Sequence, residues 1–192
     1  MLLPAQSEDK WYFDPNGLTV KSPEGARDAK TFTYDRVLNS DSTQEQAYLE
    51  AGRGTVQALL NGFNGTIFAY GQSGSGKTFT MLGPDEVVEA IKNGADEVSL
   101  EVQRMYGIIP RAIGDIFETI NRVVGAEGSQ IELSVQYLEI YNEKIQDLLS
   151  KVGSANQDLK LREMPNGQMV VMGSEHQAVR SFDDIFFALM EG

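Results

Sequence analysis

A glycine-rich stretch in the first half of the chain constrains its fold more than any other feature. The stretch matches the pattern G-x-x-x-x-G-K-[S/T] and runs Gly71-Gln72-Ser73-Gly74-Ser75-Gly76-Lys77-Thr78. Glycine permits the positive φ angles that turn successive backbone N–H groups toward one phosphate. The helix that follows such a loop brings its positive end to the same anion. The pattern therefore predicts a phosphate-binding loop between a buried strand and a helix.

The side chains of this loop have separate expected roles. Lys77 can reach the β- and γ-phosphate oxygens of a nucleotide as a mobile positive charge. The hydroxyl of Thr78 is an oxygen ligand suited to Mg²⁺. The competing interpretation is a Gly/Ser-rich surface turn with an incidental lysine. The flanking sequence favours the phosphate loop, because residues 66–70 are typical of a buried strand and residues 77–82 of a helix.

Composition excludes several other classes of protein. The 192 residues suffice for one domain, and 28 acidic against 16 basic residues give a net charge of −12 without a basic segment, so we expect no nucleic-acid partner. No run approaches 18 apolar residues, and we therefore expect no membrane span. The absence of cysteine excludes disulfides and thiol chemistry. His176 is the single histidine, which excludes a multi-histidine metal site and leaves an exposed strand end as its expected place.

Hydrophobic periodicity predicts the elements of the first half. A hairpin is expected over 11–21, with Asp14-Pro15-Asn16-Gly17 as its type I turn, and a short strand over 31–34. A helix is expected to begin near Ser42, where Ser42 and Glu45 fit a capping box. Another helix is expected to follow Pro110. Residues 83–106 are strongly acidic and indicate a solvated surface insertion, part of it helical.

The second half predicts mostly strands. A long strand is expected over 131–141, with Tyr137 and Tyr141 packing on one face, followed by a short helix after Asn142. The remaining expected elements are strands at 158–162 and 168–172 around a Pro-Asn-Gly turn, and a helix over 182–190 capped by Ser181 and Asp184.

Several stretches together resemble the nucleotide-binding core of a kinesin motor domain. Residues 64–72, the phosphate loop and residues 79–81 carry the strongest likeness. Four further stretches agree with the family in order and spacing: 32–37, 43–46, 107–111 and 137–149. The likeness covers about residues 32–192 and implies an α/β fold of the P-loop NTPase type, with a mixed, mostly parallel central sheet flanked by helices. Residues 1–192 would then be part of a motor domain, with 83–106 as a long loop-5-like acidic insertion.

The resemblance also implies a function. It implies ATP and Mg²⁺ as cofactors, held by the eight loop residues, with Thr78 as the metal ligand. It implies microtubules (tubulin) as the partner, a place in the cytoplasm on the cytoskeleton, and a possible dimer through regions outside this sequence. Within these residues, Lys160 and Arg162 are the basic side chains expected in the track-binding region.

Parts of the family pattern have no counterpart here. The Arg-x-Arg-Pro segment that ends the family's first strand is missing before Trp11, and switch I and switch II would follow the last expected helix. Asp14-Pro15-Asn16-Gly17 is a hairpin turn and does not replace switch II. Without the switches we expect nucleotide binding but no efficient hydrolysis by this segment. We also expect strand 66–70 to lack partners, so that the segment alone aggregates or stays partly unfolded, as a partial sequence would.

Two alternatives remain open at this point. One is a catalytically inactive interaction module that retains the phosphate loop. The other is an unrelated P-loop NTPase or kinase, which would require an acidic metal ligand on a neighbouring strand that the sequence does not show. Glu139 and Glu143 straddle an expected strand end, which favours solvated roles over paired acid–base catalysis.

Overall fold

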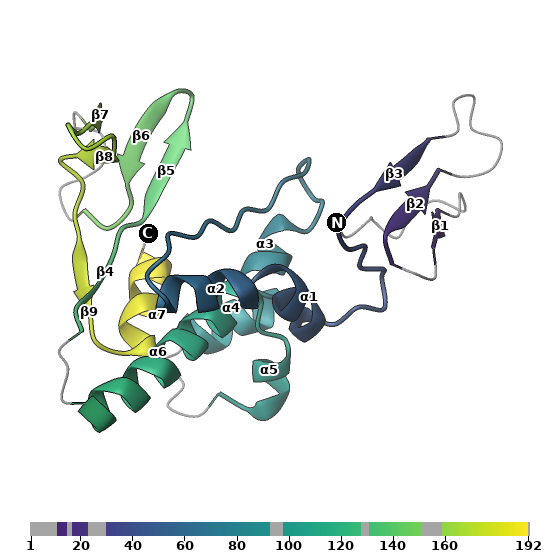
Figure 1. Ribbon diagram of the computed structural model, residues 1–192, viewed down its shortest axis with the longest axis horizontal. Coiled ribbons are helices and arrows are strands. Elements are labelled where there is room, and N and C mark those ends of the chain that lie inside the picture. The colour runs from purple at the N-terminus through teal and green to yellow at the C-terminus, as the bar shows by residue number, and fades with distance from the viewer. Residues whose placement is uncertain are drawn as a thin grey trace. The chain divides into compact units, whose positions relative to one another are not determined.

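The computed structural model describes residues 11–14, 17–22, 30–92, 98–127, 131–150 and 159–191 (Figure 1). These residues form two compact units. Unit 1 comprises the described residues within 1–90 and 96–116, and unit 2 those within 91–95 and 117–192. Every strand pair in the described residues is antiparallel. The mostly parallel central sheet therefore stays a prediction.

A small antiparallel sheet opens unit 1. Its order is β1-β2-β3, from β1 (Tyr12–Phe13), β2 (Thr19–Lys21) and β3 (Thr31–Thr33). The N–H of Gly17 donates to the oxygen of Asp14 at 2.8 Å, which closes the turn between β1 and β2. The hairpin and the following strand are thus confirmed, while Pro15 and Asn16 of the expected turn lie outside the described residues.

Helix α1 (Gln44–Ala51) begins one residue later than the capping box that the sequence predicts. Thr43 is the N-cap: its hydroxyl accepts from the N–H of Gln46 at 3.1 Å, and the Gln46 side chain accepts from the N–H of Thr43 at 2.8 Å. The Ser42 hydroxyl donates instead to Asn39. The predicted capping box of Ser42 and Glu45 is therefore wrong. Thr43 and Gln46, one residue further on, form the box and satisfy each other's backbone N–H groups.

Gly52 separates α1 from α2 (Arg53–Leu60) and lets the chain approach its neighbours closely. A β-carbon at this position would lie 2.7 Å from the ring of Tyr48 and 3.2 Å from the side chain of Ile108. Backbone without a side chain can pass at that distance, and any larger residue would push the elements apart. The glycine therefore leaves room for the Tyr48 ring of its own helix and for Ile108 of α6.

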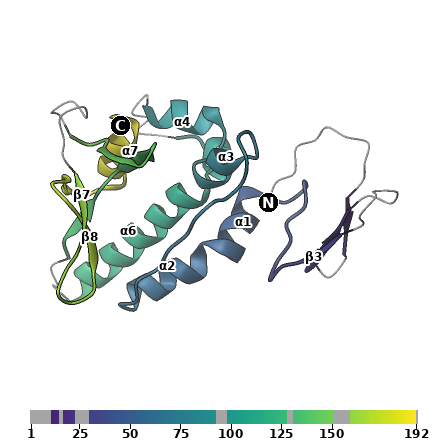
Figure 2. The ribbon, with the colours of Figure 1, turned by 90° about the horizontal axis from the view of Figure 1, so that it is seen from above.

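The hydrophobic core of unit 1 joins these helices. Tyr48, Val56 and Ile108 are buried, and four partly buried side chains pack against them: Ile67, Met81, Ala112 and Ile116. Figure 2 shows α2 running alongside the first half of α6 (Ile108–Glu127). The expected helix is present but begins at Ile108, before Pro110 and not after it. Pro110 lies in its first turn, where a missing N–H costs no intrahelical hydrogen bond. The hydroxyl of Tyr48 donates to Asp115 at 2.6 Å, which adds a polar link across the core.

The acidic insertion contains two helices in its described part, α4 (Asp85–Lys92) and α5 (Leu100–Arg104). Residues 93–97 lie outside the described residues. The N–H of Gly107 donates to Leu82 at 3.0 Å and joins the two ends of the insertion. Arg111 donates to the carbonyls of Tyr106 and Arg104 at the end of α5. Val87 is 0% exposed, so the insertion buries part of α4 and is not solvated all round.

Residues 66–70 do not form the buried strand that their sequence predicts. They lie outside any helix or strand, and none of their backbone groups has a hydrogen-bond partner among the described residues. Phe68 is 81% and Tyr70 93% exposed. A strand is held by hydrogen bonds to neighbouring strands. The described residues offer this segment no neighbouring strand, in line with the expectation that it lacks partners.

Unit 2 is built from antiparallel strand pairs where the sequence predicts one long strand and a helix. Strand β4 (Leu133–Val135) pairs with β9 (Gln177–Val179), whereas β5 (Leu138–Tyr141) pairs with β6 (Lys144–Asp147). The expected strand over 131–141 is therefore split. The short helix expected after Asn142 is wrong: Asn142 and Glu143 have φ of 48° and 63°, which make a two-residue hairpin turn that returns the chain as β6.

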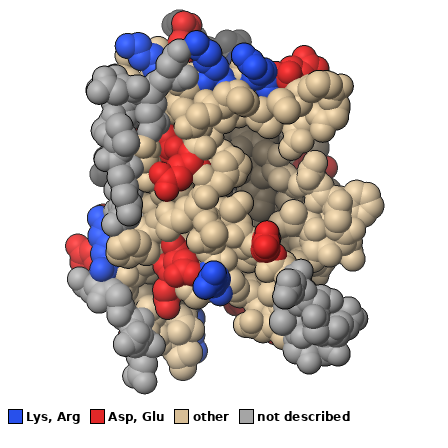
Figure 3. Space-filling model, turned by 90° about the vertical axis from the view of Figure 1, so that its left-hand side faces the viewer, with Lys and Arg blue, Asp and Glu red and all other residues tan. Residues whose placement is uncertain are grey.

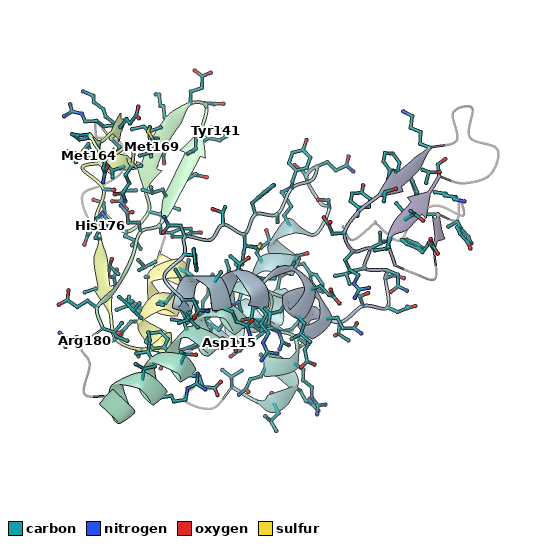
Figure 4. All side chains as sticks on the ribbon, viewed as in Figure 1. Asp115, Tyr141, Met164, Met169, His176 and Arg180 are labelled. Atoms are coloured by element: carbon teal, nitrogen blue, oxygen red, sulfur yellow. The ribbon has the colours of Figure 1, made fainter. Side chains whose placement is uncertain are left out.

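Two further strands and a helix complete the described part of unit 2. Strands β7 (Lys160–Glu163) and β8 (Met169–Met172) form the second expected hairpin, and α7 (Phe182–Glu191) the last expected helix. Ser181 and Asp184 cap α7 reciprocally, and the N–H groups of Arg180 and Ser181 hold the pKa of Asp184 below its usual range. Tyr141, which is expected to pack, is instead exposed at the end of β5 (Figure 4).

Asp147 is the buried carboxylate that ties unit 2 together. It is 2% exposed and accepts from the N–H of Leu149 at 3.0 Å and from that of Glu175 at 2.6 Å. Two backbone N–H groups from distant parts of the chain thus share one acceptor. A buried N–H that loses its partner costs about 1–3 kcal/mol.

We expect Asp147→Ala to lower the free energy of unfolding by about 2 kcal/mol, because it removes both acceptors at once. Urea unfolding followed by circular dichroism measures the change. Glu139→Ala is the matched control, since Glu139 is exposed on the neighbouring strand. Equal unfolding midpoints for the two variants would show that the Asp147 bonds do not hold the unit.

The ionisation of Tyr48 is expected to lower the stability of the folded chain in alkaline solution. Burial raises the pKa of Tyr48, and the hydrogen bond to Asp115 raises it further. An unfolded tyrosine ionises near a pKa of about 10. Below that pH both states keep the proton, so the contribution of Tyr48 is complete. Above it the unfolded chain loses the proton while the folded chain keeps it, so stability falls as pH rises.

We expect Tyr48→Phe to lower the free energy of unfolding by about 1 kcal/mol at neutral pH. Above pH about 10, the free energy of unfolding of the variant should fall less steeply with pH than that of the wild type. Urea unfolding at a series of pH values measures both effects. The difference between the two proteins isolates Tyr48 from the other groups that ionise in alkali. Parallel curves for variant and wild type would contradict the role of this proton.

Candidate functional site

The eight residues that the sequence predicts to bind phosphate form one continuous loop and the start of a helix in unit 1. The loop turns at Gly74 and Gly76, whose φ angles are +76° and +88°, and Gly76 is the N-cap of α3 (Lys77–Met81). Residues with a side chain rarely adopt such angles. The expected helix after the loop is thus present, whereas the expected strand before it is not formed.

Lys77 is turned back onto the loop. Its ammonium group donates to the carbonyl oxygens of Gly71 and Gln72, at 2.8 Å each, and the side chain is half-buried. The positive charge is therefore held at the loop by two neutral acceptors. An anion that reaches the loop can exchange these acceptors for a charge-assisted hydrogen bond, which is the stronger interaction.

Thr78 lies in the first turn of α3 and is exposed. Its hydroxyl has no hydrogen-bond partner among the described residues, so it is available as an oxygen ligand. No group of three or more His, Asp or Glu side chains converges on a possible metal site anywhere in the described residues. Mg²⁺ commonly keeps several water ligands and takes others from substrate phosphates, so it does not require such a group.

Helix α3 is anchored to its surroundings at its middle residue and just beyond its C-terminal end. The Gln44 side chain, at the start of α1, donates to the carbonyl of Phe79 at 2.6 Å. The carbonyl of Leu82, just beyond α3, accepts from Gly107 where the acidic insertion ends. The position of the loop thus depends on α1 and on the base of the insertion, which are far from it in sequence.

A cavity of about 480 Å³ adjoins this helix. Phe79 and Thr80 of α3 line it, together with residues from three other parts of unit 1: Leu38, Ser42, Thr43, Gln44, Ala47, Pro84, Glu86, Arg104 and Met105. No spacing pattern in the sequence connects these positions. The phosphate motif was therefore visible in the sequence, whereas this hollow beside it was not.

The other residues singled out by sequence play no part in this loop. His176 is exposed just before β9, as expected (Figure 4). Glu139 and Glu143 are exposed on the hairpin of β5 and β6. On the face that Figure 3 shows, acidic and basic side chains both occur among a larger uncharged area. None of the described helices is long and apolar enough to cross a membrane.

Comparison with known proteins points to one family. The family model described as kinesin motor domain matches residues 7–192. The chain is 40% identical over 165 residues to the kinesin-like protein KIF15-B of Xenopus laevis, and 40% identical over 166 residues to human KIF15. It is 36% identical over 163 residues to KIF27 of Rattus norvegicus. Each match covers 85% of this chain but only 10–11% of the relative, so the chain spans about a tenth of these proteins.

Gly74 and Gly54 form a matched test of the loop backbone. A β-carbon would meet nothing within 4 Å at either position, so Gly→Ala changes only the backbone preference. We expect Gly74→Ala to destabilise the chain by about 1 kcal/mol because of its positive φ, and Gly54→Ala, within helix α2, to stabilise it by a similar amount. Urea unfolding measures both. Stabilisation by Gly74→Ala would mean that the loop does not turn as described.

Proposed function

Because the chain belongs to the kinesin family, we propose that it is the ATP-binding part of a kinesin-like microtubule motor. The parent protein would couple ATP hydrolysis to movement along microtubules. Family membership gives the chain a P-loop NTPase fold, and the family binds ATP with Mg²⁺. The proposal for this chain concerns the residues that hold the nucleotide and the track.

One observation carries the proposal: Lys77 is held at a loop that turns through two glycines with positive φ. We assign the terminal phosphates to Gly71, Gln72, Ser73, Gly74, Ser75, Gly76 and Lys77, and the Mg²⁺ ligand to Thr78. When bound, Mg²⁺ would neutralise phosphate charge. The chain's own contribution is the lysine charge and the loop shape, which together position the phosphates.

We place the rest of the nucleotide in the cavity beside α3. Two residues of that helix, Phe79 and Thr80, line the cavity, and the same helix begins at the phosphate loop. The lining includes the exposed ring of Phe79, which suits a flat aromatic base. A ligand that spans the loop and the cavity would thus contact α3 along one side.

The finer architecture is also a proposal. We propose that residues 66–70 become a strand of a mixed, mostly parallel sheet when partner strands are present. Their exposed aromatic side chains and unpaired backbone support this, because both are what a central strand buries. We further propose that 83–106 is a loop-5-like insertion of the motor domain, packed through Val87 and joined to α6 by Arg111.

The partner follows from the family and from one exposed hairpin. Kinesins associate with the cytoskeleton, and we propose microtubules as the track of the parent protein. Lys160 and Arg162 alternate along β7 and therefore point to the same face of the β7–β8 hairpin, where both are exposed. Basic side chains there suit an acidic track, within an otherwise acidic chain.

We expect Lys77→Ala to weaken Mg·ATP binding by about 10- to 100-fold, because charge-assisted hydrogen bonds to the phosphates are lost. Fluorescence titration with a labelled ATP analogue measures the affinity. Lys92→Ala is the matched control, since Lys92 is exposed at the end of α4 and removes the same charge from the chain.

Two results would decide against the proposed site. Equal affinity of the Lys77→Ala and Lys92→Ala variants would remove Lys77 from phosphate binding. The second result concerns Mg²⁺. If the wild type and Thr78→Ala each bind the ATP analogue with the same affinity with and without Mg²⁺, the metal is not part of the site.

A further inference from the structure

Five Asn-Gly pairs occur in this chain, at Asn16, Asn61, Asn64, Asn93 and Asn166. An asparagine followed by glycine can lose its side-chain amide without an enzyme. The backbone nitrogen of the glycine attacks the side-chain carbonyl carbon, because no side chain on the glycine obstructs it. Three of the five pairs lie within the described residues, those at Asn61, Asn64 and Asn166, and their surroundings differ.

We propose that Asn64 is a site of spontaneous deamidation in the folded chain. A bond forms between the nitrogen of Gly65 and the side-chain carbon of Asn64, and the side-chain nitrogen leaves as ammonia. Water then opens the resulting succinimide ring at either of its two carbonyls. The product is an aspartate or an isoaspartate, with no oxidant or cofactor consumed.

Within the described residues, the surroundings of Asn64 leave both reacting groups free of hydrogen bonds, although one side of Gly65 lies against the side chain of Thr55. Asn64 and Gly65 are both exposed and belong to the segment between α2 and the phosphate loop that lies outside any helix or strand. Neither the Asn64 side chain nor the N–H of Gly65 has a hydrogen-bond partner among the described residues. The attacking nitrogen and the leaving amide are therefore both accessible to water and base.

Asn61 has the same dipeptide but is restrained at both reacting groups. Its side-chain nitrogen donates to the carbonyl of Gln57 at 2.8 Å. The N–H of Gly62 donates to the carbonyl of Leu59 at 2.9 Å. These bonds close the end of α2, and both must break before the glycine nitrogen can attack.

Asn166 is restrained in a different way, within the turn of the β7–β8 hairpin. Its side-chain oxygen accepts from the N–H of Gln168 at 3.1 Å. The N–H of Gly167 donates to the carbonyl of Met164 at 2.8 Å. The hairpin turn thus holds the nucleophile and the carbonyl in separate hydrogen bonds.

The product changes the segment that leads into the phosphate loop. No charged side chain lies between Arg53 and Lys77, so deamidation at Asn64 places a carboxylate in an uncharged stretch. Isoaspartate also routes the main chain through the former side chain and lengthens it by one carbon. Both changes fall between α2 and Gly71.

The test compares folded and unfolded chains, site by site. The full chain is incubated in mildly alkaline buffer with and without urea, and each asparagine is followed by peptide mass spectrometry with isoaspartate detection. We expect folding to slow deamidation at Asn61 and Asn166 by about tenfold or more, since two hydrogen bonds must open at each. Deamidation at Asn64 should proceed at nearly the same rate in the folded and the unfolded chain.

An Asn166→Ala variant is the control and should leave the rate at Asn64 unchanged, whereas Asn64→Ala should abolish the product at position 64 and leave the product at Asn61 unchanged. The proposal is overturned if Asn64 in the folded chain reacts no faster than Asn61 and Asn166. It is also overturned if folding slows all three sites equally, or slows none of them.

Discussion

The close contact between helix α1 and the start of α6 is the interaction on which unit 1 depends. Gly52 lets the backbone pass against the Tyr48 ring and Ile108, and the Tyr48 hydroxyl adds a hydrogen bond to Asp115. Apolar packing and a buried polar link thus act at one place. Because interiors are packed densely, a larger residue at position 52 would have to displace the side chains of Tyr48 and Ile108 and would not simply fill space.

The position of the candidate site depends on this contact indirectly. Helix α6 begins beside Gly107, whose N–H holds the carbonyl of Leu82 just beyond α3, and α1 begins at Gln44, whose side chain holds the carbonyl of Phe79. Helix α3, which follows the phosphate loop, has only five residues, and these two hydrogen bonds hold it against α1 and the start of α6. A helix this short has little stability by itself, so tertiary contacts position it.

Local chemistry explains which parts of the fold the sequence predicts. The hairpin over 11–21, the β7–β8 hairpin and the capped helix α7 rest on turn and cap residues close in sequence, and they form as expected. The errors arise where two local solutions compete. Thr43 and Gln46 form the cap in place of Ser42 and Glu45, and the left-handed Asn142 and Glu143 make a hairpin where an apolar pattern suggested a helix.

By itself, the sequence determined the phosphate loop and the family, because glycines, a lysine and a threonine at fixed spacing act within a few residues of one another. Only the tertiary structure decided where the Lys77 charge rests, which residues line the cavity beside α3, and that residues 66–70 stand unpaired. The physical reason is that charge placement, cavities and strand pairing depend on groups distant in sequence, whose approach is governed by packing.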